Sequence, residues 1–381
     1  VGADQDFYFL EMNTRLQVEH PVTEMVYGLD LVEKMIRVAA GEELGLTQED
    51  IVADGWAVEA RVYAEDPARG FLPSIGQLVR YREPEGDGVR VDSGVTEGGE
   101  ISMYYDPMIA KLVAHAPTRT AAIDRLHLAL DHYEIDGIVS NRQFLSAVLE
   151  NDTFRRGDLT TGFIAAEFDG DFIAGAPADD ATAGLVALGT AIVALQMEER
   201  HAGDPDTGFV VVDQTGTRRM IELTHVSNRS ARMTVDGAGY NLAGGLQAPV
   251  MLFDGTINEV PVAVQVRQSG HKVVLTNGAA RLALTVLPAR YEPMLDHMPA
   301  PAEGAGADEI TAPMPGQITR ILVNVGDEVV EGQDVAIIEA MKMENVLSAE
   351  ARGRVRDIAV KIGDNLNVDD LIMALDLADE N

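Results

Sequence analysis

The C-terminal part of the chain contains an internal repeat, and this repeat limits the possible folds more than any other feature. Residues 316–338 match residues 353–375 when shifted by 37 positions, with glycine on glycine and apolar side chains on apolar side chains. The matching pairs are Gly316 with Gly353, Ile318 with Val355, Ile321 with Ile358, Val323 with Val360, Val325 with Ile362, Gly326-Asp327 with Gly363-Asp364, Val329 with Leu366, Val335 with Ile372 and Ile338 with Leu375. Short β-rich runs that occur twice predict a pseudo-symmetric sandwich of short antiparallel strands.

Lys342 lies between the two copies, in Ala340-Met341-Lys342-Met343. The chain has only five lysines, and this one has a methionine on each side. Two apolar thioethers beside a solvated lysine have no obvious core to join. The pattern predicts a hairpin turn that presents Lys342 for attachment of a prosthetic group.

Residues 311–377 resemble a biotinyl carrier domain, whose modified lysine lies between two methionines in an Ala-Met-Lys-Met turn. The resemblance implies a flattened all-β sandwich and biotin attached covalently to Lys342 by a biotin protein ligase. A lipoyl carrier domain shares the sandwich, but it typically has Asp before and Ala after its lysine. An ordinary surface hairpin with a chance Met-Lys-Met would not explain the surrounding repeat.

Near the N-terminal end, polar residues occupy every second position. The polar set is Glu11, Asn13, Arg15, Gln17 and Glu19, and the apolar residues Leu10, Met12, Leu16 and Val18 alternate with it. This alternation predicts an extended strand with one polar face. A solvated outer face is the simpler explanation, but carboxylate and amide oxygens suit Mg²⁺ or Mn²⁺, and a guanidinium suits a small oxyanion.

This segment is similar to the active-site strand of biotin carboxylases, a branch of the ATP-grasp enzymes. The resemblance implies that Glu11 and Asn13 hold the divalent metal that bridges the phosphates of ATP. It also implies that Arg15, Gln17 and the backbone of Val18 bind bicarbonate.

The same resemblance implies that Glu19 is the base that deprotonates bicarbonate. Residues 58–67 form a second alternating block that resembles the family, and it implies that Arg61 stabilises the biotin enolate. Residues 104–111 also resemble a family block, which we expect near the same pocket without assigning it a step.

The likeness to biotin carboxylases covers residues 1–168. No glycine-rich phosphate-covering loop and no nucleotide-binding lysine occurs in the expected order, and the chain does not begin with methionine. We therefore expect residues 1–168 to be the C-terminal portion of a biotin carboxylase, and we expect this chain alone not to turn over ATP.

The middle region, residues 169–299, begins with a stretch rich in Gly, Ala and Asp. Residues 181–200 are apolar on most sides and predict a buried helix, and short β-type runs with turn residues follow to residue 290. This pattern predicts an antiparallel barrel wrapped on the helix, which resembles the subunit-contact domain of acyl-CoA carboxylases. Residues 300–310 predict a flexible Pro, Ala and Gly linker that lets the carrier travel.

The predicted fold class is multidomain α+β: part of an ATP-grasp biotin carboxylase, a helix plus antiparallel β-barrel, and a biotinyl sandwich. This combination resembles the α subunits of acyl-CoA carboxylases, most of all bacterial propionyl-CoA carboxylase. It implies a carbon–carbon ligase that uses ATP and bicarbonate to carboxylate biotin on Lys342. The carboxyl group then passes to propionyl-CoA on a carboxyltransferase β subunit, giving methylmalonyl-CoA. Methylcrotonyl-CoA and acetyl-CoA are alternative acceptors, and a passive carrier or scaffold is the alternative of another class.

Composition excludes some partners. Acidic residues number 62 against 29 basic residues, and the net charge of −33 argues against binding of nucleic acid. No run of eighteen apolar residues occurs, so we expect no membrane span. The absence of cysteine fits a reducing compartment, either the cytoplasm of a bacterium or the mitochondrial matrix of a eukaryote.

Overall fold

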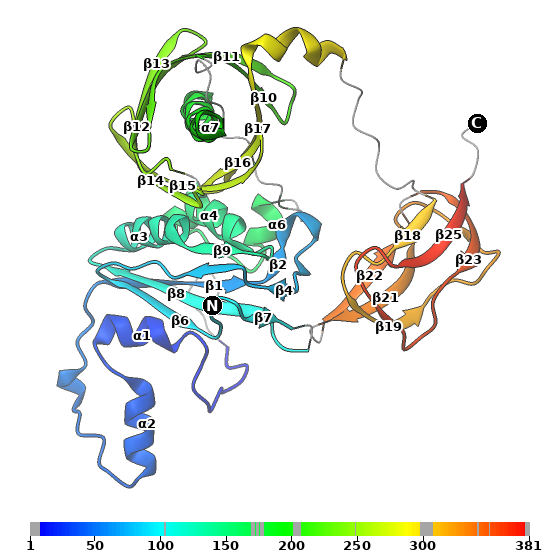
Figure 1. The fold of residues 1–381 in the computed structure, drawn as a ribbon. Helices are drawn as coiled ribbons and strands as arrows, with labels where there is room; N and C mark the ends of the chain where they lie inside the picture. The colour runs from blue at the N-terminus through cyan, green and yellow to red at the C-terminus, as the bar shows by residue number, and fades with distance from the viewer. Residues whose placement is uncertain are drawn as a thin grey trace.

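The computed structural model describes residues 8–102, 104–168, 172, 175, 179–200, 207–247, 249–297, 308–340, 343–349 and 351–377. Figure 1 shows three bodies: an α/β unit that contains the N-terminal residues, a β-barrel around a helix, and a C-terminal β-sandwich. The predicted multidomain α+β class is therefore confirmed.

The first unit is built on an antiparallel sheet of order β1-β8-β6. Its strands are β1 (Trp56–Tyr63), β8 (Met108–Ala116) and β6 (Val89–Ser93). Helix α3 (Arg119–His132) packs on one face, and helix α1 (His20–Tyr27) lies against the other. The site described below lies between the sheet and α1.

Alternation along β8 separates the two faces of this sheet. Leu112 and Ala114 join Ile123 and Leu126 of α3 in the apolar core. Successive side chains of a strand point to opposite faces, so Lys111 points toward α1. The remaining elements of the unit are α2 (Leu31–Ala39), the 3-10 turns η1 (Gln48–Asp50) and η2 (Pro67–Arg69), β2 (Glu65–Asp66), β3 (Leu72–Pro73), β4 (Gly76–Gln77), β5 (Arg80–Arg82), β7 (Glu100–Ile101), β9 (Glu134–Asp136), α4 (Arg142–Glu150), α5 (Asp152–Arg156) and α6 (Phe163–Glu167).

The prediction of a strand over Glu11–Glu19 was wrong. Residues 8–17 have no regular secondary structure, and residues 18 and 19 form the turn that leads into α1. A strand needs a neighbour for its N–H and C=O groups, and no described strand pairs with this segment. Leu10 is 90% exposed and Met12 is 72% exposed, so the alternation has no core to point into.

The middle region folds as predicted, with a helix inside an antiparallel barrel. Helix α7 (Asp179–Arg200) is apolar around its circumference, and Leu188 and Ile192 are fully buried. In the described part of the chain, eight strands close the barrel around it. They are β10 (Gly208–Asp213), β11 (Arg218–Ser227), β12 (Ser230–Val235), β13 (Ala238–Gly244), β14 (Leu252–Ile257), β15 (Val260–Ser269), β16 (Lys272–Asn277) and β17 (Ala280–Pro288), followed by the 3-10 segment η3 (Ala289–His297).

The barrel docks on α3 and α4 of the first unit through polar contacts. Gln265 donates from its amide Nε2 to the carbonyl of Tyr133 at 2.6 Å. The backbone N–H of Gly278 donates to Asp131 Oδ1 at 2.8 Å. His127 Nε2 lies 2.8 Å from Glu150 Oε1, which also accepts the N–H of the residue after Gly278.

The C-terminal sandwich reproduces the sequence repeat strand by strand. A shift of 37 residues carries β19 (Gly316–Ile321) onto β23 (Gly353–Ile358), β20 (Glu328–Val329) onto β24 (Asn365–Leu366), and β21 (Asp334–Ala340) onto β25 (Leu371–Leu377). With β18 (Glu309–Thr311) and β22 (Met343–Ser348), the described residues form two four-stranded sheets.

The two halves exchange equivalent hydrogen bonds. Gly326 N donates to Val355 O at 2.8 Å, and Gly363 N donates to Ile318 O at 2.8 Å. Gly326 and Gly363 both have φ 95°, a left-handed value that favours glycine. The predicted pseudo-symmetric sandwich is therefore confirmed.

Among the described residues, no helix combines the length and the apolar character needed to cross a membrane.

Candidate functional site

A row of charged side chains crosses the sheet on the side that faces α1. The strand register pairs Arg61 of β1 with Lys111 of β8, and Lys111 with Asp92 of β6. Neighbouring residues in register share a face of a sheet, so these three side chains lie side by side. Glu59 and Arg90, each two residues away along its strand, lie on the same face.

Arg61 lies between two carboxylates. Its Nη2 donates to Glu19 Oε2 at 2.9 Å, and its Nε is 3.6 Å from Glu59 Oε1. The Glu59 side chain is only 7% exposed, and its Oε2 has no hydrogen-bond partner among the described residues. Burial raises the pKa of Glu59, an effect that the charges of Lys111 and Arg61 oppose. Glu59 is thus a buried anchor, whereas Glu19 is half-exposed.

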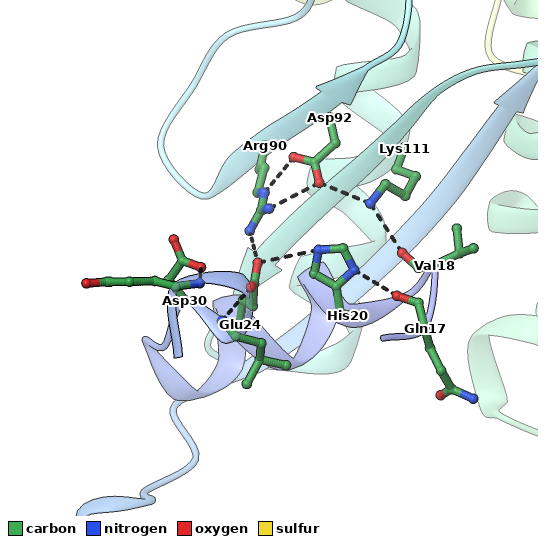
Figure 2. A network of polar contacts seen from close by, with 10 residues as sticks. Gln17, Val18, His20, Glu24, Asp30, Arg90, Asp92 and Lys111 are labelled. Atoms are coloured by element: carbon green, nitrogen blue, oxygen red, sulfur yellow. Dashed lines mark hydrogen bonds and ion pairs between the residues drawn. The ribbon is translucent and has the colours of Figure 1, made fainter. Parts of the chain in front are cut away.

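Lys111 connects the sheet to the segment before α1. Figure 2 shows its ammonium between Asp92 and the carbonyl of Val18. Lys111 Nζ lies 3.1 Å from Asp92 Oδ2 and donates to Val18 O at 3.2 Å. Burial would raise the pKa of Asp92, but its hydrogen bonds to Arg90 and Lys111 lower it.

Glu24 holds α1 itself against the sheet. Arg90 Nη1 donates to Glu24 Oε2 at 2.7 Å, and the N–H of Leu31 donates to Glu24 Oε1 at 2.7 Å. His20, one turn before Glu24, lies with its Nδ1 2.7 Å from the carbonyl of Gln17 (Figure 2). The helix begins at His20 with proline in its first turn and ends at a left-handed glycine, so its short length is set locally.

The structure brings together only some of the residues predicted from the sequence. Val18 and Glu19 lie at the charged face with Arg61, and Gln17 takes part through its backbone. Arg15 donates to the neighbouring Leu16 carbonyl at 3.2 Å and is exposed.

Glu11 and Asn13 are exposed and make no side-chain hydrogen bond or ion pair to other described residues. Their carboxylate and amide oxygens are the hard donors that Mg²⁺ or Mn²⁺ prefers, so the donor set fits such a cation.

Sequence reasoning missed four members of this cluster. Glu24, Arg90 and Asp92 lie outside the blocks that resemble the family, and Glu59 stands in the block 58–67, where the resemblance assigns a role only to Arg61. Lys111 stands in the block 104–111, which we expect near the pocket. It is also one of only five lysines in the chain, and this rarity could have drawn attention to it. Their grouping depends on strand register, which sequence alone does not supply.

Met341 and Lys342 lie outside the described residues. Strands β21 and β22 pair on either side of them, with Glu339 opposite Glu344 and Ala340 opposite Met343. The predicted antiparallel pairing of the two flanking strands is present.

Family models match four parts of the chain. The Biotin carboxylase C-terminal domain matches residues 59–166, and the Biotin-requiring enzyme family matches residues 308–375. The Propionyl-coenzyme A carboxylase BT domain matches residues 190–300. The Carbamoyl-phosphate synthase L chain, ATP binding domain, matches residues 1–47.

Two curated relatives cover nearly the whole chain. The propionyl-CoA carboxylase alpha chain of Ruegeria pomeroyi is 43% identical, and the match covers 98% of this chain and 59% of that protein. The mitochondrial propionyl-CoA carboxylase alpha chain of Homo sapiens is 36% identical, and the match covers 99% of this chain and 54% of that protein. The chain thus spans little more than half the length of these relatives.

Among solved structures, the chain is similar to the biotin carboxylase domain of Hydrogenobacter thermophilus 2-oxoglutarate carboxylase, in complex with magnesium ADP and bicarbonate. The identity is 45%, the TM-score is 0.43, and the match covers 45% of this chain and 38% of that one.

Proposed function

Because the chain belongs to the family of biotin-dependent acyl-CoA carboxylase α subunits, we propose that it supplies carboxylating and carrier parts of a propionyl-CoA carboxylase. The observation that carries this proposal is the hydrogen bond from Arg61 Nη2 to Glu19 Oε2 at 2.9 Å, which joins two residues to which the resemblance assigns roles in one reaction. A carrier sandwich on the same chain supports it. We assign residues 1–168 to the carboxylase, 169–299 to subunit contact, 300–310 to the linker and 311–377 to the carrier.

In the proposed reaction, Arg15 binds bicarbonate together with Gln17 and the backbone of Val18. The planar guanidinium matches a small oxyanion with two parallel hydrogen bonds. Glu19 accepts the bicarbonate proton, which makes the oxygen nucleophilic toward the terminal phosphate of ATP. Glu11 and Asn13 would hold Mg²⁺ or Mn²⁺, which would supply positive charge to offset the negative charge of the ATP phosphates.

Arg61 stabilises negative charge on the ureido oxygen of biotin. Its Nε lies 3.6 Å from the buried Glu59 Oε1, and its Nη2 donates to the half-exposed Glu19. Biotin on Lys342 would supply the ureido nitrogen that takes up the carboxyl group.

We propose propionyl-CoA as the acceptor, bound on a carboxyltransferase β subunit that contacts the barrel. The names of the two relatives and the match to the BT domain support this choice. We propose the cytoplasm of a bacterium or the mitochondrial matrix of a eukaryote as the location, and a bacterial relative and a mitochondrial relative support these two alternatives.

The first experiment tests the carrier. Co-expression with a biotin protein ligase is expected to add one biotin mass to the chain, measured by intact-protein mass spectrometry. Lys342→Ala should abolish the gain, whereas Lys361→Ala, in a turn of the same sandwich, should retain it. A Lys342→Ala protein that still gains the mass would disprove the attachment site.

The second experiment tests catalysis in the subunit extended to the length of its relatives. Bicarbonate-dependent ATP cleavage should fall strongly in Arg15→Ala. Carboxylation of propionyl-, methylcrotonyl- and acetyl-CoA is then compared with the β subunit present. No bicarbonate-dependent cleavage in the parent protein would favour the passive carrier, and preference for another acyl-CoA would replace the proposed acceptor.

A further inference from the structure

The charged layer between α1 and the sheet contains a lysine that the proposed reaction does not use. Lys111 lies in the central strand of the sheet, and its side chain is only 13% exposed. Burying an ammonium costs free energy unless it is paired and hydrogen-bonded. A lysine retained here therefore needs partners, and the structure provides two.

The first partner is Asp92, whose carboxylate forms an ion pair with the Lys111 ammonium. Asp92 also accepts two hydrogen bonds from Arg90, at 2.7 and 3.1 Å, so Arg90 orients the carboxylate independently of Lys111. The ion pair between Lys111 and Asp92 spans 3.1 Å in a partly buried setting, where electrostatic interactions are stronger than at the surface.

The second partner is the carbonyl of Val18. A charged donor makes a stronger hydrogen bond than a neutral one, and this bond joins residues 93 positions apart in the chain. The peptide group between Val18 and Glu19 is planar, so holding the Val18 oxygen also sets the orientation of the Glu19 N–H.

Two successive carbonyls before α1 are held in this way. The imidazole of His20 is within hydrogen-bond distance of the Gln17 carbonyl, and Lys111 holds the next one, that of Val18. The segment has no strand pairing of its own among the described residues, so side-chain contacts replace a β-ladder here. Figure 2 shows both contacts on the same turn.

We propose that Lys111 is a positioning residue of the carboxylating site. It holds the Val18 carbonyl against the sheet through its ion pair with Asp92, and thereby sets the backbone that binds bicarbonate and carries Glu19. This inference rests on the proposed function and adds to it a residue that touches neither bicarbonate nor ATP.

The test is Lys111→Met in the subunit extended to the length of its relatives, because methionine keeps the length of the side chain and removes charge and donors. Loss of a charged hydrogen bond should raise the KM for bicarbonate about tenfold, while the KM for ATP changes less than about twofold. Lys111→Arg keeps charge and donors and should restore the KM for bicarbonate to within about threefold of the parent value. Lys272→Met, at an exposed lysine of the barrel, is the matched control and should match the parent.

Asp92→Asn covers the case in which Lys111→Met does not fold. It preserves an acceptor for Arg90 and removes the charge that holds Lys111, and it should raise the KM for bicarbonate about threefold. Unchanged bicarbonate KM in both variants would overturn the inference, as would equal rises in KM for bicarbonate and ATP.

The Arg15→Ala variant separates the two proposals. If the parent is active, Arg15→Ala is impaired and Lys111→Met behaves as the parent, only the positioning role fails. If the parent shows no bicarbonate-dependent ATP cleavage, the proposed function fails and takes the positioning role with it.

Discussion

Gly189 offers a direct test of the helix-in-barrel packing. It lies in the middle of α7, where a Cβ atom would lie 2.9 Å from Leu284 Cδ1 and 3.0 Å from Val273 Cγ1. A third side chain, Leu275, would lie 3.5 Å away. The contact with Leu284, below 3.0 Å, requires that side chain to shift. All three neighbours belong to β16 and β17 on the inner side of the barrel.

The substitution Gly189→Leu adds a whole side chain to this filled space. Overpacking costs about 3 kcal/mol at this size, and the better helix propensity of leucine recovers about 1 kcal/mol. The net loss is about 2 kcal/mol of unfolding free energy. For a domain of about 130 residues, whose unfolding entropy is about 2.1 cal/mol/K per residue, that lowers the melting temperature by about 7 °C.

Differential scanning calorimetry of the chain measures this shift. Gly239→Leu is the matched control, because Gly239 is exposed on β13 and an added Cβ would meet nothing within 4 Å. The control should melt within about 2 °C of the parent, since surface substitutions have small effects. If Gly189→Leu melts with the control, α7 is not packed inside the barrel as the distances require.

Two further predictions concern buried and half-buried charges. Glu59→Met removes a buried carboxylate with an unsatisfied oxygen, so it should raise the unfolding free energy of the chain by about 1 kcal/mol at pH 8. In the extended subunit it should lower biotin-dependent turnover about tenfold, because Arg61 loses the contact with Glu59 that orients it. A destabilised, fully active variant would contradict both parts. The hydrogen bond to Glu150 raises the pKa of His127, so its stabilising contribution is present below the ordinary histidine pKa and is lost as pH rises through the raised value. His127→Gln should therefore lower the free energy of unfolding by about 0.5–1 kcal/mol near pH 5.5 and by almost nothing near pH 9. Denaturant unfolding at the two pH values measures both losses, and equal losses would refute the prediction.

Pattern alone was sufficient for the carrier sandwich and the barrel helix. The two-residue period of a strand and the glycines of its turns are local properties of the sequence. Because the sandwich contains two copies of one pattern, the strands of the second copy follow those of the first at a constant spacing. The helix of the barrel is apolar all round, which is possible only if other elements surround it.

The alternating segment Glu11–Glu19 shows where pattern was insufficient. Alternation predicts which side chains share a face only if the chain is extended, and extension requires hydrogen bonds from a neighbouring strand. No described strand provides them, so Glu11 and Asn13 stay apart from the cluster that Val18 and Glu19 join.

The sequence by itself therefore determined the kinds of folded unit and the two strands that flank Lys342, and the resemblance supplied candidate residues for the proposed carboxylating site. The tertiary structure alone decided that Arg61, Lys111 and Asp92 stand in one row beneath Val18. These residues come from three strands far apart in the chain, and a slip of one residue in their register would turn each side chain to the opposite face.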